Sequence, residues 1–459
     1  MAGRRKHRGV SVGTVLMLCV TAVVLLGFGA ILPKLGSNTH VTIDTGKVLQ
    51  ALSLGDHMPE LSLDNIPITV IKTETAAPVV TAPATEAPAV FAPVVPTATP
   101  TAAPTATPVP GGSFTAVFGG SINIDSDLRQ EHYFKEAQRY DFQDVLMLLE
   151  DQLTADLSMV TLENTIDADG KLSDVNTTAD VLPMLSRKGV NMVALAHKNV
   201  YNYGMDGLQA TLAALDKENL PAVGAYAGAK EAGAEQRLME VGGVKVALLH
   251  YTTDALADKG RNALKKDGNT FAVAQDTLSD GADAILADVA EVRAQGAQVV
   301  MVSLNSTATL NKSTSNKKQI AFAQQLADAG VDVIIGNGSR VVQPVTWLTG
   351  NLTDGTTKQV LCAYSLGNFI STQNHHGYTD TGMILEFEVN EQADGTLKVE
   401  NVGYVPTYCW KHDNTLQVVP ALDYSESRPE GMGKDSYNRL KTTINETRNL
   451  IADEFPEIG

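Results

Sequence analysis

Residues 319–345, QIAFAQQLADAGVDVIIGNGSRVVQPV, decide the fold that we expect for this chain. The first half carries apolar residues three and four positions apart, which predicts a helix capped at Ser315 or Asn316. The β-branched run at 331–336 then predicts a buried strand, and the polar residues at 336–340 predict a loop directly after it. Loops at the carboxyl ends of strands carry the functional site in α/β folds, so we expect the site here.

Helical and strand patterns alternate through much of the chain upstream of this stretch. This alternation predicts an α/β domain in which helices pack on mostly buried strands. We expect that domain at residues 113–412, followed by a tail at 413–459 that contains a helix. The patterns used are strands at 114–124, 157–164 and 190–196, and helices around Val145, Leu148 and Leu149, over 207–215 and over about 279–295.

The first part of the chain predicts export and attachment to a membrane. Residues 1–9 are basic, and residues 10–33 contain no charge and are long enough to cross a bilayer as a helix. Because basic residues stay in the cytoplasm, we expect a single-pass protein of the cell membrane whose C-terminal domain is extracytoplasmic. A cleaved signal peptide is the alternative, and it also exports the domain. Residues 76–112 are rich in Pro, Thr and Ala and predict an extended linker, whereas residues 34–75 remain unassigned.

Net charge and cysteine content restrict the partners and the covalent links. With 52 acidic and 35 basic residues the formal net charge is -17, which argues against nucleic acid as a partner. Cys19 falls in the expected anchor. We expect Cys362 and Cys409 to be buried free thiols, with a disulfide between them as the alternative.

Four motifs, in one order along the chain, carry a family resemblance. They are YSLGNFI at 364–370, LADAGVDVIIG at 326–336, VVQPV at 341–345, and Tyr203-Gly204 followed by GLQATLAAL at 207–215. Together they resemble the CapA family of bacterial poly-γ-glutamate capsule-synthesis proteins, over residues 114–410. That family's domain is related to calcineurin-like metallophosphoesterases. The resemblance therefore implies a metallophosphoesterase-like layered sandwich, with helices packed on two mixed β-sheets.

The metal-binding positions that the resemblance implies are mostly changed in this chain. Gly119-Gly120 stands where the family has Gly-Asp, and only the acid of Asn-Leu-Glu is kept, as Glu163. Residues 196–199 read AHKN instead of Ala-Asn-Asn-His, and residues 305–307 read NST instead of His-Trp-Gly. Residues 336–340 read GNGSR instead of Gly-His-His-Pro-His. Neutral amides and a hydroxyl are weak metal ligands, so we expect no metal and no cofactor.

Two cations lead to a hypothesis about binding. Lys198 and Arg340 occupy positions where the resemblance implies metal ligands, so we expect them to replace the metal's charge near Glu163 and to hold an oxyanion. One alternative is that the cluster neutralises itself as an internal ion pair, and the other is two solvated cations on unrelated loops. The ligand-binding candidates are Glu163, Lys198, Asn199, Asn305, Asn337, Gly338 and Arg340.

Catalytic candidates are weak. Only Glu163 and His197 could serve a single-metal hydrolase, and a lone histidine in a polar loop is more often a hydrogen-bonding group. We expect His250, His375 and His376 to be surface residues, because no carboxylate lies at metal spacing from them.

The preferred interpretation is a membrane-anchored cell-envelope protein with a decayed metal site. The resemblance implies a role in capsule or wall-polymer synthesis or attachment, with an anionic envelope polymer or polymer-synthase subunits as partners. The enzymatic alternative is a metal-dependent hydrolase that acts on phosphoesters or wall-polymer amides. A structural surface protein without a ligand pocket is the third possibility.

Overall fold

The computed structural model describes residues 39–43, 68–72, 112–233, 237–279, 281–373, 378–413, 415–451 and 455–458. The chain divides into two compact units, Met1–Thr101 and Ala102–Gly459. In the first unit, β1 (Thr39–Ile43) pairs antiparallel with β2 (Ile68–Lys72). The expected anchor at 10–33 and nearly all of the expected linker at 76–112 lie outside the described residues. Among the residues that are described, no helix is both long and apolar enough to span a bilayer.

The second unit is built on two mixed sheets, which confirms the α/β prediction. In the eight-stranded sheet, β3 is central: it pairs parallel with β6 and β17 and antiparallel with β18. The path through this sheet is β10 (Ala222–Val223), β9 (Met192–Ala194), β6 (Leu157–Leu162), β3 (Ser113–Ile122), β18 (Thr381–Glu391), β19 (Leu397–His412) and β20 (Thr415–Pro420), with β17 (Asn368–Ile370) beside β3.

The six-stranded sheet has a parallel centre and two antiparallel edges. Its edge strands β11 and β15 both run antiparallel to their neighbours. The order is β11 (Leu238–Val241), β12 (Val244–Thr252), β13 (Val299–Asn305), β14 (Val333–Asn337), β16 (Thr357–Ala363) and β15 (Val345–Asn351).

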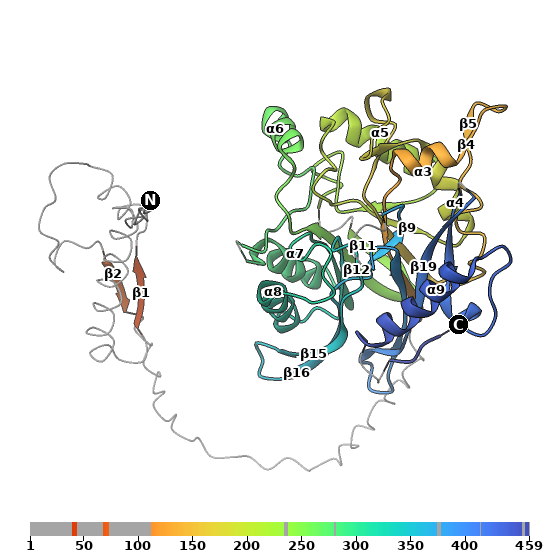
Figure 1. Cartoon of the computed structure of the whole chain (residues 1–459). Helices are drawn as coiled ribbons and strands as arrows, with labels where there is room; N and C mark the ends of the chain where they lie inside the picture. Colours follow the sequence, from red (N-terminus) through yellow and green to blue (C-terminus); the bar gives the residue numbers. More distant parts are fainter. Residues whose placement is uncertain are drawn as a thin grey trace, which may run out of the picture. The chain divides into compact units, whose positions relative to one another are not determined.

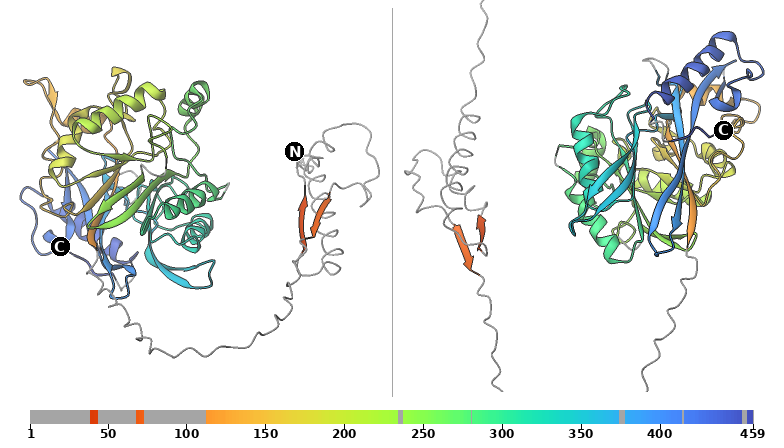
Figure 2. Two further views of the ribbon diagram at one scale, coloured as in Figure 1. Left: turned by 180° about the vertical axis from the view of Figure 1, so that it is seen from behind. Right: turned by 90° about the horizontal axis from the view of Figure 1, so that it is seen from below.

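Three hydrophobic clusters define the layers of this unit. One cluster contains Phe118 and Met159 of the first sheet together with Leu248 and Met301 of the second, so the two sheets pack face to face. A second cluster covers the outer face of the first sheet, and a third covers the outer face of the second. Figures 1 and 2 show helices on the outer side of each sheet. The helices are α3 (Ser126–Glu131), α4 (Leu182–Arg187), α5 (Gly204–Lys217), α6 (Asp258–Asp267), α7 (Asp283–Ala294), α8 (Lys317–Asp328) and α9 (Lys434–Arg448).

Local sequence signals locate α8 and β14 correctly. The side chain of Asn316 accepts hydrogen bonds from the backbone N–H groups of Lys318 and Gln319, and the Gln319 side-chain oxygen accepts one from the Asn316 N–H. This capping box satisfies N–H groups that a helix start leaves free. Gly330 ends the turn after the helix with a φ of 83°. The predicted buried strand follows as β14, whose five residues are all buried.

The predicted helix around Val145, Leu148 and Leu149 is wrong. Residues 143–148 form successive turns instead. Two carbonyls in or directly after these turns accept from distant partners. That of Val145 accepts from the Val418 N–H, and that of Leu149 accepts from the Lys188 ammonium. The apolar spacing therefore reflects burial against β20 and the first sheet, not a helix face.

The C-terminal residues complete the same unit. Helix α9 packs on β19, where Leu440 and Ile444 join a cluster with Trp410. Arg439 of this helix forms an ion pair of 2.5 Å with Asp380, immediately before β18. Figure 1 shows α9 beside β19.

Candidate functional site

The carboxyl ends of the parallel strands from both sheets meet along one seam, and their side chains bond across it. Asn305 ends β13 and Asn337 ends β14, and the two are register partners. Facing them from the other sheet are Thr161 of β6 and Glu163, which follows β6. Three of the sequence candidates, Glu163, Asn305 and Asn337, are therefore brought to one place.

Glu163 is held by neutral donors. One carboxylate oxygen accepts a bond of 2.8 Å from the Asn305 amide and another of 2.9 Å from the Ser121 hydroxyl. Asn305 and Ser121 are each 2 % exposed, so both donors are buried. No ion pair of Glu163 occurs within the described part of the chain. The carboxylate is thus held by charge-assisted bonds from an amide and a hydroxyl.

Asn337 makes the second contact across the seam. Its amide nitrogen lies 2.9 Å from the Thr161 hydroxyl oxygen, and both side chains are buried. The amide oxygen of Asn337 has no partner among the described residues. The backbone carbonyl of Asn337 accepts from the Ser306 N–H, which joins the loops after β13 and β14.

His250 is fully buried, so the prediction of a surface residue is wrong. Its Nε2 lies 3.1 Å from the carbonyl oxygen of Ala196, and its Nδ1 lies 2.9 Å from the Ser303 hydroxyl. A carbonyl only accepts, so Nε2 carries the proton and Nδ1 accepts from Ser303. Burial lowers the pKa of His250 from 6.5 to about 4, because the interior disfavours the charged form. The predictions for His375 and His376 lie outside the described residues.

His197 is buried next to this contact. The N–H of Asn199 donates to its Nδ1 at 3.3 Å, so the ring proton lies on Nε2, which has no partner among the described residues. Burial, followed by the charges of His250 and Lys198, lowers the pKa of His197 from 6.5 to about 3. The side chain of Asn199 accepts from Asn202 and closes a turn. His197 is therefore neutral, and the backbone N–H of Asn199 fixes which of its ring nitrogens carries the proton.

Two glycines of the candidate loops leave no room for metal-binding side chains. A Cβ on Gly120 would lie 2.3 Å from the carbonyl oxygen of Gly367, in the SLGN turn. A Cβ on Gly338 would lie 2.7 Å from the backbone nitrogen of Ser306, and its φ of 94° suits glycine. The positions where the resemblance implies an aspartate and a histidine are thus filled by backbone.

Lys198 has a carboxylate neighbour that the sequence hypothesis did not name. The positive charge of Lys198 acts to lower the pKa of Asp254, although burial has the larger effect and raises this pKa overall. Asp254 also accepts a bond of 2.9 Å from the Thr307 N–H and so fixes the loop after β13. Asp254 is therefore a carboxylate close enough to feel the charge of Lys198.

Arg340 adopts an uncommon backbone conformation. Its φ is 70°, in the left-handed region that side chains with a Cβ rarely occupy. Bonds on either side hold the loop: the Ser339 hydroxyl donates to the Val341 carbonyl, and the Asn311 N–H donates to the Ser339 carbonyl. The described part of the chain offers the guanidinium no hydrogen bond or ion pair at all. Strain that is retained at a position often accompanies a functional constraint.

These residues do not fit a metal ion. Glu163 and Asp254 are the carboxylates at these strand ends, and each already accepts a hydrogen bond. His197 carries its proton on Nε2, so that nitrogen has no lone pair to offer a cation. Within the described ranges, no group of three or more His, Cys, Asp or Glu side chains is arranged to hold a metal.

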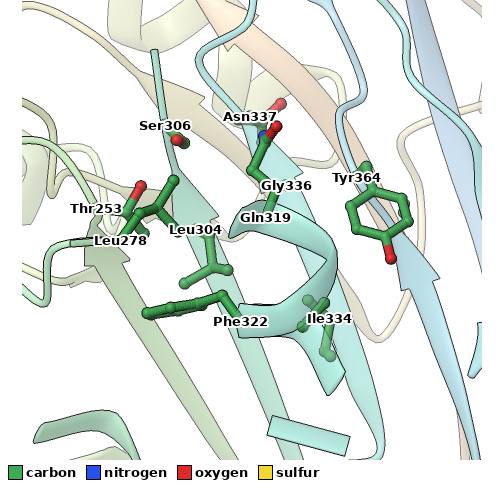
Figure 3. A pocket seen from close by; sticks show the side chains of 12 residues that line it. Thr253, Leu278, Leu304, Ser306, Gln319, Phe322, Ile334, Gly336, Asn337 and Tyr364 are labelled. Carbon is green, nitrogen blue, oxygen red and sulfur yellow. The ribbon is translucent and has the colours of Figure 1, made fainter. Parts of the chain in front are cut away.

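A small cavity lies behind the seam, under α8. Its volume is about 30 Å³, room for about one water molecule. Figure 3 shows Leu304, Phe322 and Ile334 around it, with Ser306 and Asn337 at one end. Glu163, Lys198 and Arg340 do not line it, so it is not a pocket for a polymer.

The two remaining cysteines are free. Cys362 and Cys409 are both buried thiols, which confirms the expectation, and they belong to different clusters on the outer faces of the two sheets. Burial raises the pKa of each thiol to about 12.

Residues 115–373 match the family model described as bacterial capsule synthesis protein PGA_cap. The PGA biosynthesis protein CapA of Bacillus subtilis is 25% identical over 287 residues, which cover 62% of this chain and 64% of that protein. The chain thus spans less than two thirds of the length of this relative. A probable polyglutamine synthesis accessory protein of Mycobacterium tuberculosis is 26% identical over 274 residues, covering 56% of this chain and 68% of that protein.

Solved structures show more distant likeness. A calcineurin-like phosphoesterase, YfkN from Bacillus subtilis, aligns with a TM-score of 0.36 and 13% identity, over 73% of this chain and 97% of that chain. The NAD nucleotidase of Haemophilus influenzae aligns with a TM-score of 0.33 and 11% identity, over 74% of this chain and 64% of that chain.

Proposed function

Because the chain belongs to the bacterial capsule synthesis protein PGA_cap family, we propose that it acts in the synthesis or attachment of an anionic envelope polymer, with poly-γ-glutamate as the first candidate. It acts by binding, not by hydrolysis. The relatives named for PGA biosynthesis and polyglutamine synthesis support this polymer class. The observation that carries the binding proposal is the uncommitted guanidinium of Arg340, which is held at a φ of 70° next to a seam whose carboxylate is already bonded.

The proposed binding surface consists of the loops at 196–199 and 336–340. Arg340 grips one carboxylate of the polymer with two parallel N–H donors, as its planar fork allows. Lys198 contributes a second charge, reduced by its neighbour Asp254. Asn305 and Ser121 hold Glu163, and it makes no ion pair with either cation within the described part of the chain.

We also propose where the protein lies in the cell. Residues 10–33 anchor the chain in the cell membrane, and the linker at 76–112 holds the folded unit outside, where an exported polymer would meet it. Protease added to cells whose wall has been removed should then release a fragment that contains the second unit. Protection of that fragment, while added protease digests a known outer-surface protein, would place the unit inside.

Binding to three ligands tests the proposal with the purified full-length protein. We expect poly-γ-glutamate to bind more tightly than teichoic-acid fragments or inorganic phosphate. Arg340→Ala should weaken that binding roughly 10-fold or more, as expected for the loss of a charge-assisted bond of about 1.5–3 kcal/mol. Lys198→Ala should weaken it less, and Arg428→Ala, which removes an exposed cation after η6 (Ala421–Tyr424), should leave it unchanged.

Two results would overturn this proposal. Unchanged affinity of the Arg340→Ala and Lys198→Ala double variant would show that the two loops are not the binding surface. Equal losses for Arg428→Ala and Arg340→Ala would show that only the overall charge matters.

A further inference from the structure

The positions at which the family resemblance implies metal ligands are joined directly to each other in this chain. We propose that Asn305 and Asn337 form an amide bridge that holds the two sheets together at their carboxyl ends, in the place and in the bridging role of a metal centre. We define the amide bridge as Asn305 bonded to Glu163 and Asn337 bonded to Thr161. It is independent of the proposed polymer binding.

Topology makes these bonds cross-links between layers. Thr161 and Glu163 belong to the end of β6 in the eight-stranded sheet, whereas Asn305 and Asn337 end β13 and β14 in the six-stranded sheet. Below the seam the sheets pack through apolar side chains such as Phe118 and Leu248, whose contacts are not directional. The two hydrogen bonds of the amide bridge fix the position of one sheet relative to the other at the carboxyl ends of the strands, where the apolar packing ends.

Burial gives these bonds their effect. Both asparagines are 2 % exposed and Thr161 is fully buried, so an amide that loses its partner has little water to replace it. A buried donor left without a partner destabilises the fold by its full desolvation cost. The bond to Glu163 is the stronger of the two, because its acceptor is charged.

Backbone packing excludes the metal-binding alternative at the same place. The carbonyl of Gly367 fills the space for a carboxylate at position 120, and that carbonyl also accepts from the Ser121 N–H at 2.9 Å. Ser121 in turn donates its hydroxyl to Glu163, so the closed backbone and the bridge share one residue. The amide bridge is therefore built into the strand ends, and no cation is needed to neutralise like charges there.

A double-mutant cycle on the full-length protein measures the bridge. Asn305→Ala and Glu163→Ala should each lower the thermal unfolding midpoint by roughly 2–8 °C, and the double variant should lose little more than the larger single variant. An exposed pair with the same chemistry supplies the control, since the Asn401 amide donates to Glu388 at 2.8 Å. Asn401→Gly, which suits the φ of 51° at that position, and Glu388→Ala should each shift the midpoint by about 1 °C or less.

The isosteric variant Asn305→Asp decides the case even where a truncated variant does not fold. It replaces the donor by a carboxylate facing Glu163, so the midpoint relative to the unmodified protein should fall at pH 7.5 and partly recover at pH 5.5, where the two acids share a proton. Asn401→Asp should show no such recovery. Additive losses in the cycle, or an Asn305→Asp protein that unfolds at the original midpoint at both pH values, would overturn the amide bridge.

Discussion

The side-chain amide of Asn305 donates a bond of 2.8 Å to the carboxylate of Glu163, although the two residues are 142 positions apart in the chain. The relationship links the ends of strands in two different sheets. It also explains why Glu163 can persist at the seam without a cation, because an amide and a hydroxyl satisfy the same carboxylate oxygen. These two bonds occupy one of the two carboxylate oxygens and leave the negative charge in place.

The first prediction separates an acceptor role of Glu163 from a charge role. Glu163→Gln keeps an oxygen that can accept from Asn305 and Ser121, so we expect it to lose only about 1 kcal/mol of unfolding free energy. Glu163→Ala leaves both donors unpaired and should lose about 2–4 kcal/mol. Urea unfolding followed by circular dichroism measures both. Equal losses for the two variants would show that the acceptor geometry is irrelevant.

Metal addition supplies the second prediction. A metal that binds the folded state raises its stability by mass action. Because the seam residues do not fit a metal, we expect the unfolding midpoint of the full-length protein to stay within about 1 °C when micromolar Mn²⁺ or Zn²⁺ is added or when a chelator is added. A saturable rise of several degrees that Glu163→Ala abolishes would establish the hydrolase alternative's metal site instead.

Local chemistry explains which parts of the fold were predictable. The Asn316 cap, helix α8 and strand β14 follow from spacing and capping within a few residues, and the structure contains all three. The turns at 143–148 were predicted as a helix because their apolar residues are buried by β20, which is far away in sequence. Local periodicity carries no information about such a distant partner.

The same reasoning applies to the site. The YSLGNFI motif and the changed ligand positions led to the correct strand ends, since loops after parallel strands gather at one edge of a sheet. The burial of His250 was missed, because its partners are distant in sequence: Ser303 lies in the neighbouring strand β13, and Ala196 lies in the loop after β9 of the other sheet. Ser121 and Asp254 were missed for the same reason: each acts through a contact with a distant loop.

Acid sensitivity is the third prediction. In the unfolded chain both histidines become protonated near the ordinary pKa of 6.5. In the folded protein His250 becomes protonated only near pH 4 and His197 only near pH 3, because their pKa values are lowered to about 4 and about 3. The contribution of the two histidines to stability is therefore constant well above pH 6.5 and falls below it, by about 1 kcal/mol per histidine between pH 6.5 and 5.5. Urea unfolding between pH 6.5 and 5.5 measures this slope. His250→Gln should reduce the slope by about half, and an unchanged slope would contradict a buried neutral His250.

Thiol reactivity gives the fourth prediction. A thiol whose pKa is about 12 is almost entirely protonated at pH 8, and both Cys362 and Cys409 are buried as well. A Cys19→Ser variant should therefore react slowly with a thiol reagent while folded and should expose two fast-reacting thiols in urea. One or two fast thiols in the folded variant would contradict the burial of these side chains.

The last prediction separates binding from stability at Arg340. A non-glycine residue at a φ of 70° carries backbone strain of about 1–3 kcal/mol, and glycine adopts the same conformation without it. Glycine also gains more freedom in the unfolded chain, which offsets about 0.5–1 kcal/mol. The unfolding free energy of Arg340→Gly should therefore equal that of the unmodified protein or exceed it by up to about 1 kcal/mol. Its affinity for poly-γ-glutamate should fall as much as that of Arg340→Ala. Arg340→Ala keeps the strain and should be the less stable of the two. The pair of variants is informative. If Arg340 serves packing, both variants should be less stable than the unmodified protein. If it is a strained residue that serves binding, both variants should bind more weakly, and Arg340→Gly should keep its stability. Urea unfolding and equilibrium binding on the same preparations measure the two quantities.

An Arg340→Gly protein that binds as tightly as the unmodified one would end the assignment of Arg340 as the ligand-binding cation. A loss of several kcal/mol of unfolding free energy in that variant would show that the guanidinium supports the fold.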